Sequence, residues 1–457
     1  MRCAKRIYCL FVDALLLSFC MVITSSCRQP YQVKEVTRHP EPIVIQGPLV
    51  SSIHGEPWLR VRIDGDINKA TIHCDGSLWL GPATQDQQVH KDARLFISPV
   101  TITTETANRA RQNIHTGGFI LIDGNGDALR WALKQIQIQP PGRAQALAYG
   151  NNLFPGKLIC TPSQAAGNLA TDVSRFDLVN HVPLESYLPG VLEHELYASW
   201  DAASYRAQAI AARSYALFER GLHSHRAYDI ESTVASQVYG GLASRAKAIE
   251  AVRLTRGQVL VYNDRVLPAY YSSCSGGIGQ DAAKVFPGVV DILPLQGDPH
   301  GRWGSKSKNY HWEPFTRDKN SLIRHLAAWG RANNHPIGSI SSIKSIDITG
   351  RNRAGRPTEF TVTDEAGREF SLSAEWFRFA CNYDDTGLPD VASNKRLKSS
   401  FVQIRVVGDL VQFYNGRGMG HGVGLCQWGM QEMSQAGYSE ESILTFYYRG
   451  ASIKRIY

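Results

Sequence analysis

The sequence lacks the patterns that mark several common functional classes. No CxxC pair and no Cys/His pair at metal-ligand spacing follows residue 27, so the sequence predicts no metal site and no cofactor. No Lys/Arg run is dense enough for a nucleic-acid-binding stripe, and nucleic acid is not expected as a partner. No internal repeat is present. The glycine-rich run at 416–424 has no Lys-Ser/Thr after it, which excludes a Walker-type phosphate loop.

Cysteine is sparse in the body of the chain. The nine cysteines include four within the first 27 residues, and the other five are odd in number and widely spread: Cys74, Cys160, Cys274, Cys381 and Cys426. This spacing excludes a dense disulfide framework, although one or two bridges remain open. We expect Cys274 and Cys426 to lie near each other, because each falls in one of the glycine-rich motifs described below.

The overall composition is that of a globular protein. The 457 residues are 43% hydrophobic and 20% charged, and the 40 glycines and 21 prolines indicate many turns. This length is enough for two or three domains. The formal net charge of +8 is modest and suits an anionic polymer or a membrane surface without deciding between them.

The N-terminus has the features of an export signal. A positively charged start and a short apolar run at 14–23 are followed by small residues before Cys27. Residues 1–27 are therefore predicted to be a lipoprotein signal, with Cys27 acylated and the protein exported to the cell envelope and anchored to a membrane. Asp13 and Thr24 depart from the usual lipoprotein pattern, so a simple cleaved signal and an uncleaved anchor remain alternatives.

The patterning after the signal predicts an α+β protein. Residues 28–48 contain four prolines and no hydrophobic periodicity, which predicts a tether. Residues 49–180 form a β-rich leading region, and residues 181–457 a mixed helical region that ends in a strand, a glycine-rich turn and a helix. Strand-like runs of the leading region occur at 59–64, 70–75, 77–81, 94–104, 118–123, 157–161 and 176–182.

The second region alternates between helical and extended patterns. Apolar and small residues at three- and four-residue steps predict a helix over 200–220, which Ser199 or Asp201 can cap. The remaining predicted elements are two strands around an Asn-Asp turn within 256–277, an irregular segment at 278–315, a helix at 319–333, strands within 341–364 and a helix at 425–435.

Two carboxylates immediately before the helix at 200–220 are candidates for acid–base chemistry. Glu193 and Glu195 lie in a predicted loop, where a rigid helix on the C-terminal side can hold an acid in place. The alternative is that both are solvated loop residues. The sequence pattern does not decide whether these glutamates are catalytic or solvated.

Other segments offer weaker candidates. Ser272–Gly277 and the glycine-rich run are flexible and polar, and Cys274 with His421 can be imagined as a nucleophile and a base, although no surrounding motif supports this. Arg206 and Arg213 share one helical face and can bind an anion or pair within the structure. Trp303, Tyr310, Trp312, Trp428 and Tyr239 can stack on sugar rings or simply pack.

Taken together, these segments resemble the sporulation stage II protein D family, which includes amidase-enhancer-like proteins. The matching segments follow the family's order: LVNHVPLESYLPGVLEHELYASW (178–200), YRAQAIAARSYAL (205–217), SQVYGG (236–241), RGQVLVYN with YYSSCSGG (256–277) and GRGMGHGVGLCQWGMQEMSQAG (416–437). The leading region also resembles that of the family, though without a sharp motif. Some members carry a zinc-binding Cys/His cluster near this SQVYGG-like motif, but residues 229–237 contain neither residue type.

The resemblance implies a peptidoglycan lytic transglycosylase that acts on glycan strands already stripped of peptide by an N-acetylmuramoyl-L-alanine amidase. Glu195 matches the family's catalytic glutamate, and Glu193 is the second choice. The remaining site residues expected from the resemblance are Gln208, Arg213, Ser273, His421 and Gln427. The rival expectation is a glycan-binding or amidase-activating module that cleaves no bond.

Overall fold

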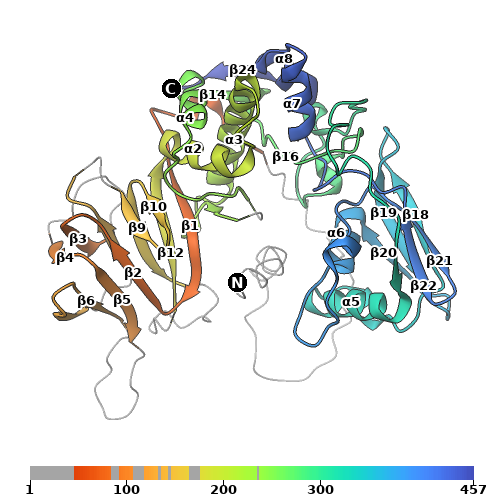
Figure 1. Ribbon diagram of the computed structural model, residues 1–457, viewed down its shortest axis with the longest axis horizontal. Coiled ribbons are helices and arrows are strands. Elements are labelled where there is room, and N and C mark those ends of the chain that lie inside the picture. Colours follow the sequence, from red (N-terminus) through yellow and green to blue (C-terminus); the bar gives the residue numbers. More distant parts are fainter. Residues whose placement is uncertain are drawn as a thin grey trace, which may run out of the picture. The chain divides into compact units, whose positions relative to one another are not determined.

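The computed structural model describes residues 46–83, 92–105, 118–131, 135–142, 146–163, 175–233 and 236–457 (Figure 1). The predicted export signal with Cys27, and all but the last three residues of the predicted tether, lie outside these residues. None of the helices in the described ranges combines the length and the apolar character needed to cross a membrane. The mixture of helices and several sheets confirms the predicted α+β class.

The described chain divides into two compact units. Unit 1 comprises the described residues Tyr271–Glu432, and unit 2 comprises Gln46–Tyr270 together with Met433–Tyr457. Unit 2 therefore holds both the β-rich leading region and the first helices of the predicted helical region. The expected boundary near residue 180 falls inside a strand of this unit.

Unit 2 contains two large sheets whose strands alternate between buried and exposed positions. In β1, for example, Leu59 and Val61 are fully buried, as expected for a strand with one face on a core. The seven-stranded sheet has the order β13 (Ile230–Glu231), β1 (Trp58–Ile67), β12 (Phe176–Pro183), β11 (Lys157–Pro162), β8 (Ile136–Gln139), β3 (Ser77–Pro82) and β4 (Arg94–Ile97). The six-stranded sheet has the order β10 (Asn152–Phe154), β9 (Leu147–Tyr149), β2 (Lys69–His73), β5 (Val100–Glu105), β6 (Gly118–Ile122) and β7 (Ala128–Trp131).

All seven strand-like runs predicted for the leading region are confirmed, with one difference. The run at 94–104 is divided at the cis Ser98–Pro99 bond into β4 and β5, which belong to different sheets. The short strands β7, β8, β9 and β10 have too few residues to show a clear alternation, and the sequence did not predict them.

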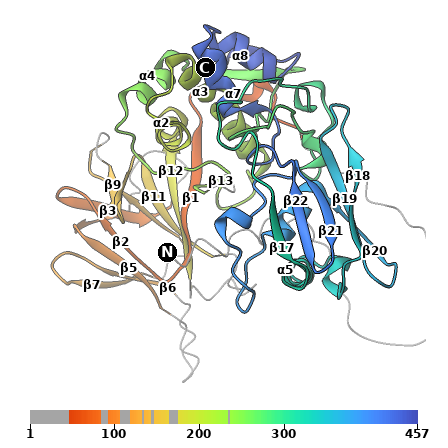
Figure 2. The ribbon, with the colours of Figure 1, turned by 45° about the vertical axis from the view of Figure 1, so that its right-hand side comes forward.

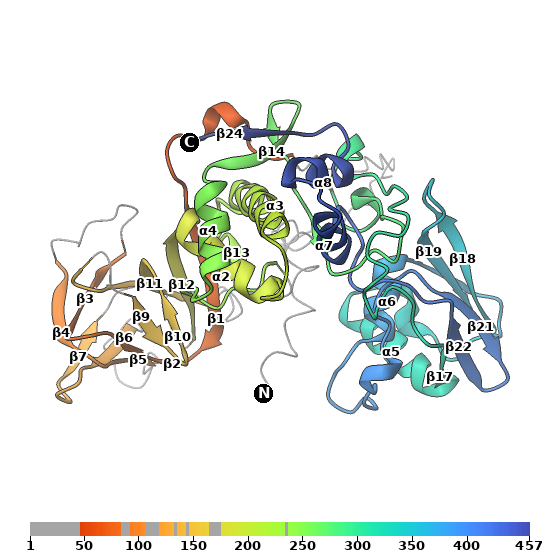
Figure 3. The same cartoon turned by 45° about the horizontal axis from the view of Figure 1, so that its top comes forward.

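The helices of unit 2 pack around one long helix, α3 (Ala202–Leu222). Figure 3 shows α2 (Leu184–Glu195) and α4 (Ala246–Leu254) alongside it. α3 is buried over most of its circumference, because its many alanines allow neighbouring elements to approach closely. α8 (Glu440–Tyr447) also packs on α3, and a three-stranded sheet has the order β15 (Arg265–Val266), β14 (Gln258–Tyr262) and β24 (Ser452–Arg455).

The hairpin between β14 and β15 turns as the sequence predicted. Asn263 and Asp264 have φ values of 49° and 57°, the left-handed conformation that a two-residue hairpin turn requires. The helix predicted at 200–220 is confirmed as α3, with Asp201 at its N-cap position.

Unit 1 combines two three-stranded sheets with two helices (Figure 2). The sheets have the orders β17 (Phe315–Asp318), β22 (Leu410–Tyr414), β21 (Gln403–Val407) and β18 (Ser345–Arg351), β19 (Pro357–Thr363), β20 (Glu369–Ser373). α5 (Lys319–Ala332) and α6 (Ala374–Cys381) share one apolar core with them, in which Leu322, Phe360 and Phe377 are fully buried. Asp318 caps α5 by accepting the Ser321 N–H at 2.7 Å.

The two glycine-rich motifs of unit 1 meet in a pair of short parallel strands. β16 (Tyr271–Ser272) pairs with β23 (Leu425–Cys426), and α7 (Gln427–Gln435) begins directly after β23. Short 3₁₀ helices complete the described elements at Val50–Ser52, Ala282–Lys284, Leu293–Leu295, Pro336–Ser339 and Ser393–Lys395.

Candidate functional site

The two candidate glutamates lie on a helix rather than in the loop that the sequence predicted. Both belong to the last turn of α2, which ends at Glu195. The sequence signal was misleading because Pro189 and Gly190 usually interrupt helices. The helix forms despite Pro189 and Gly190 because α2 packs an apolar face, which includes Leu188 and Leu192, into the core.

Gly190 allows α2 to approach the segment 236–241 closely. A Cβ atom at Gly190 would stand 2.1 Å from the backbone oxygen of Gly241. Only glycine fits this contact without moving one backbone away from the other. The helix that carries Glu195 is therefore fixed against the SQVYGG motif.

The Glu195 carboxylate is half-buried and faces this motif. Its Oε1 accepts the backbone N–H of Val238 at 3.3 Å. Burial raises the pKa of the Tyr187 phenol well above its ordinary value, and Tyr239 and the Glu195 carboxylate contribute further, which places Glu195 within electrostatic range of Tyr187.

The motif itself is held in place by buried polar contacts. Gln237 accepts a hydrogen bond from the Tyr187 hydroxyl at 3.0 Å and donates one to the Ala212 carbonyl on α3 at 3.3 Å. The Tyr239 hydroxyl donates to Asn180 of β12 at 3.0 Å. The N–H group that contacts Glu195 is thus anchored to a helix and a sheet, which is the arrangement a positioned acid requires.

Glu193 has a different and structural environment. Its carboxylate accepts hydrogen bonds from the backbone N–H and hydroxyl of Ser244, at 2.7 and 2.8 Å, and from the backbone N–H of Arg245 at 3.2 Å. These residues lead into α4. Burial acts to raise the pKa of Glu193, but the hydrogen bonds from Ser244 and Arg245 together lower it below the ordinary value. Glu193 therefore holds the start of α4 as a carboxylate.

The loop after Glu195 is fastened by basic residues at the start of α4. Arg245 donates to the Leu196 carbonyl at 2.7 Å and to the Tyr205 hydroxyl at 2.8 Å, and Lys247 donates to the Ala198 carbonyl at 3.1 Å. Among the residues that follow Glu195, Leu196 and Trp200 are buried, whereas Tyr197 is 58% exposed.

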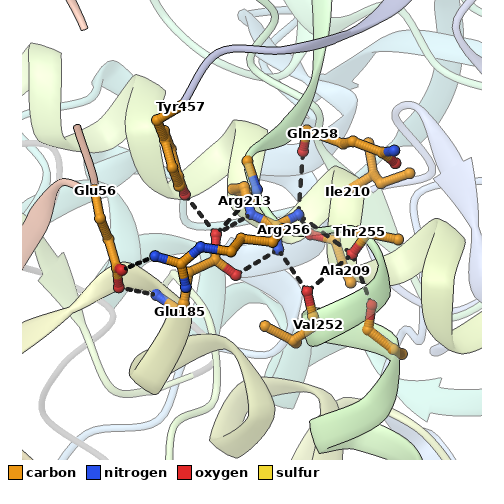
Figure 4. A network of polar contacts seen from close by, with 12 residues as sticks. Glu56, Glu185, Ala209, Ile210, Arg213, Val252, Thr255, Arg256, Gln258 and Tyr457 are labelled. Carbon is orange, nitrogen blue, oxygen red and sulfur yellow. Dashed lines mark hydrogen bonds and ion pairs between the residues drawn. The ribbon is translucent and has the colours of Figure 1, made fainter. Parts of the chain in front are cut away.

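Arg213, a predicted substrate contact, is the centre of a buried network (Figure 4). Its side chain is fully buried and pairs with Glu185 through two hydrogen bonds of 2.9 and 2.8 Å. It also donates to the Gln258 carbonyl at 3.1 Å, and the Tyr457 hydroxyl donates to Glu185 at 2.6 Å. This network ties α3 to α2 and to the segment before β14. The predicted contact of Arg213 with substrate would require the network to open.

Glu185 remains a carboxylate inside this network. Burial acts to raise its pKa, but the hydrogen bonds and charge of Arg213 outweigh that effect, and the pKa lies below its ordinary value. Arg206, seven residues earlier on α3, forms a similar two-bond pair with Glu440 of α8, at 2.9 and 3.0 Å. The two arginines that share a helical face are therefore both paired within the protein.

Gln208 is the remaining predicted site residue of unit 2. It is fully buried on α3, and neither Oε1 nor Nε2 has a hydrogen-bond partner among the described residues. An unpaired buried amide is costly, so its retention points to a role outside packing. Its contact with substrate stays a prediction.

Ser273, His421 and Gln427 belong to unit 1, where the structure brings their motifs together. Ser273 follows β16 and Gln427 follows β23, and the Ser273 carbonyl accepts the Trp428 N–H at 3.1 Å. The His421 Nδ1 accepts the Val423 N–H at 3.0 Å. Burial lowers the pKa of His421 to about 4, so the ring is neutral at neutral pH.

Sequence reasoning missed the residue that joins these motifs to the nearby sheet. Arg356, fully buried at the start of the β19 region, donates to the carbonyls of Ser275 and Ile278 at 2.9 and 2.8 Å and to the His421 carbonyl at 3.2 Å. Burial lowers its pKa to about 10. No local motif marks Arg356, because its partners are backbone groups from distant segments.

Several expected aromatic contacts are packing contacts in the structure. Trp312 is buried and its indole N–H donates to the Gly418 carbonyl at 2.8 Å. Tyr239 is buried in unit 2 as described above. Trp303 and Trp428 are half-buried. The region that the structure describes contains no group of three or more His, Cys, Asp or Glu residues arranged to hold a metal ion.

The fold and these motifs define an α+β protein in which a glutamate at the end of a helix faces a polar loop, and in which two glycine-rich motifs meet in a pair of short strands. Residues 172–262, which run from β12 to β14, match the family model described as stage II sporulation protein, SpoIID. The chain therefore contains a region that is similar to this family.

Individual relatives agree with the family match. The chain is 29% identical over 282 residues to an uncharacterized protein of Brachyspira hyodysenteriae, covering 60% of this chain and 68% of that protein. It is 27% identical over 292 residues to the amidase enhancer of Bacillus subtilis, covering 58% and 40%, and 24% identical over 299 residues to the stage II sporulation protein D of Bacillus subtilis, covering 60% and 75%. The match thus spans less than half of the amidase enhancer.

Proposed function

We propose that this protein is a peptidoglycan lytic transglycosylase that cleaves glycan strands lacking stem peptides, with Glu195 as its single general acid and base. The observation that carries the proposal is the different environment of the two glutamates. Glu193 is committed to the start of α4, whereas Glu195 ends α2 half-buried against the Val238 N–H. The match of residues 172–262 to the SpoIID family model supports the same choice.

One carboxyl group is sufficient for this reaction. The protonated Glu195 donates its proton to the oxygen of the bond between N-acetylmuramic acid and N-acetylglucosamine as that bond breaks. The C6 hydroxyl of the same muramic acid then attacks C1, and Glu195 takes the hydroxyl proton. The products are a 1,6-anhydro end and a free sugar hydroxyl, with no water consumed. Glu195 returns to its protonated form.

Three arginines were candidates to hold the lactyl carboxylate that each muramic acid exposes once its peptide is removed. Arg206 and Arg213 are paired with Glu440 and Glu185. Arg417, within the glycine-rich segment, has no carboxylate partner among the described residues, and its guanidinium lies over the Phe401 ring at 5.7 Å. We therefore assign the lactyl contact to Arg417.

Charge reversal tests this assignment. Arg417→Glu is expected to raise the KM for peptide-free glycan about tenfold or more, because an attractive charge-assisted contact is replaced by repulsion. Arg253→Glu, in an exposed pair with Glu250, provides the control and is expected to leave the KM unchanged. Equal KM values for Arg417→Glu and wild type would sink the assignment.

The proposed substrate also implies the protein's surroundings. An N-acetylmuramoyl-L-alanine amidase would supply peptide-free strands, and the chain would be exported to the cell envelope, with Cys27 lipidated and anchored to a membrane. The anchor is tested by the incorporation of radiolabelled lipid, which is expected for the wild-type protein and should be lost in Cys27→Ala. Recovery of the wild-type protein from the cytoplasm alone would contradict export.

A second function is favoured by one specific observation, the similarity to a protein named amidase enhancer. In that case the chain would bind glycan or activate an amidase without cleaving the strand. Mass spectrometry of purified peptide-free glycan after incubation separates the possibilities. Anhydro-muramic ends support the transglycosylase, intact strands support the binding module, and ordinary reducing ends indicate a hydrolase.

A further inference from the structure

Two buried cysteines of unit 1 lie side by side in motifs that are distant in the sequence. Cys274 follows β16 and Cys426 ends β23, the two strands that pair in parallel through Ser272 and Cys426. Both side chains are fully buried, and both cysteines are free thiols in the structure. Cys160 and Cys381 are also buried, but no hydrogen bond or ion pair joins either thiol to another cysteine in the described residues.

The backbone around the two thiols fixes their relative position. Cys274 exchanges backbone hydrogen bonds with Met419, at 3.1 and 2.8 Å. The Cys426 Sγ accepts the backbone N–H groups of Ser275 and Gly429, at 3.3 and 3.4 Å. The residue that follows Cys274 is thus bonded directly to the sulfur of Cys426.

Gly304 closes the space over both sulfur atoms. A Cβ atom at Gly304 would lie 3.2 Å from the Cys426 Sγ and 3.6 Å from the Cys274 Sγ. The Cys274 Sγ lies 3.8 Å from the Gly304 carbonyl oxygen, to which it can donate. Both sulfurs therefore lie beside Gly304 and are shielded from solvent.

The two thiols differ in acidity. The neighbouring Cys274 thiol and the backbone N–H groups of Ser275 and Gly429 lower the pKa of Cys426, although burial opposes this. The neighbouring Cys426 and burial raise the pKa of Cys274.

We propose that Cys274 and Cys426 form a disulfide bond under oxidising conditions, and that this bond staples the SSCSGG motif to the GLCQWG motif. The pairing of β16 with β23, and the position of both sulfurs within 4 Å of a Cβ atom at Gly304, are compatible with the short span of a disulfide. The bond would hold Ser273 and Gln427, the residues that precede and follow the two cysteines, at a fixed separation.

The reaction balances with a disulfide of a thiol oxidoreductase, or oxidised glutathione, as the two-electron oxidant. The Cys426 thiolate attacks one sulfur of the oxidant, so that a mixed disulfide forms and a thiolate leaves. Cys274 loses its proton and attacks the Cys426 sulfur, so that the protein disulfide forms and the second thiolate of the oxidant leaves. The protein loses two protons and two electrons, and the oxidant gains them.

Burial sets the order of events. An oxidant cannot reach the two buried sulfurs of the folded unit, so the mixed disulfide must form before this part of the chain has folded. Once formed, the bond is protected from reductants by the same packing. The disulfide is therefore a product of folding in an oxidising compartment, which is what the proposed export would provide.

Peptide mapping of the full-length protein tests the pairing without relying on export. The reduced, denatured protein is refolded in a glutathione buffer rich in the oxidised form, alkylated with N-ethylmaleimide in denaturant so that buried free thiols react, and digested without reduction. The expected result is one cross-linked peptide containing Cys274 and Cys426, with Cys160 and Cys381 carrying the label. Label on all four cysteines, or a different pairing, would overturn the proposal.

Thermal unfolding gives an independent readout. Protein refolded under oxidising conditions is expected to unfold about 5–15 °C higher than protein refolded with reductant, because a bond closing a long loop restricts the unfolded chain. Cys381→Ser is expected to keep this difference, and Cys274→Ser/Cys426→Ser to lose it. Identical melting temperatures for the wild-type protein refolded with and without reductant would contradict the staple.

Labelling of free thiols in the cells that make the protein tests the disulfide separately from the export. A disulfide found both in cells and after refolding supports the pairing of the two cysteines and the export of the protein. A disulfide after refolding together with free thiols in cells supports the pairing and contradicts export to an oxidising compartment.

Discussion

The two regions that carry the predicted site residues are stabilised by different kinds of contact. Around α2, α3 and α4 of unit 2, buried or half-buried charges are paired, as in Arg213–Glu185, and Glu193 holds the start of α4. In unit 1, the paired glycine-rich motifs rely on backbone hydrogen bonds, glycines with positive φ and neutral sulfur contacts. The first arrangement fixes a carboxyl group, and the second brings two backbones together.

This difference predicts that different kinds of substitution will destabilise the two regions. The helical region should be most sensitive to the loss of one charge of a pair, because the remaining charge stays buried without compensation. Apart from the buried Arg356 that joins them, the glycine-rich motifs should tolerate changes of charge but not the addition of a side chain. Substitutions in each region can therefore break or sharpen the comparison.

The largest effect on stability is expected for Arg213→Met. This change leaves the Glu185 carboxylate buried without its partner and should lower the free energy of unfolding by about 3–5 kcal/mol. Urea denaturation measures it. Arg253→Met, which breaks the exposed pair with Glu250, is the control and should show no measurable change. Equal effects of the two substitutions would contradict the role given to the buried network.

An intermediate effect is expected for Gly418→Ala in unit 1. Gly418 has a φ of 79°, and a Cβ atom would stand 2.7 Å from the Cys274 carbonyl oxygen. Strain and collision together should cost about 1–3 kcal/mol. Gly408→Ala provides the matched control, because Gly408 also has a positive φ, of 55°, but has no atom within 4 Å of the added Cβ. A smaller cost at Gly418 than at Gly408 would show that the close approach of the motifs is unimportant.

The smallest effect is expected for Glu193→Gln. The amide keeps an acceptor for the N–H groups at the start of α4 but loses the charge that favours a helix N-terminus, so stability should fall by about 0.5–1 kcal/mol. Cleavage of peptide-free glycan should continue at a rate close to that of wild type. A Glu193→Gln protein that is fully folded and inactive would reverse the assignment of the two glutamates.

Much of the fold was predictable from local patterns. Alternation of apolar residues predicted β1, β2, β11 and β12, and helical periodicity predicted α3 and α5. These elements are long enough for their period to be visible. α2 was not predicted, because Pro189 and Gly190 suggested a loop and only tertiary packing makes the helix stable.

The site was predictable only where chemistry is carried in a local motif. The motif order selected Glu195, whose catalytic role stays a prediction, and Cys274 and Cys426 lie near each other, as expected. The environments of Arg213 and Arg356 were not predictable, because their partners come from segments far away in the sequence, such as Tyr457 for the Arg213 network and His421 for Arg356. Tertiary pairing of this kind leaves no local periodicity.

The most direct test of the central claim is the count of 1,6-anhydro-muramic ends released from peptide-free glycan by wild-type, Glu195→Gln and Glu193→Gln proteins. The account predicts anhydro ends with the wild type and Glu193→Gln, and a loss of at least about 100-fold with Glu195→Gln, because general acid catalysis contributes a factor of that order. Circular dichroism confirms that the inactive variant is folded. Undiminished release of anhydro ends by folded Glu195→Gln would contradict the account.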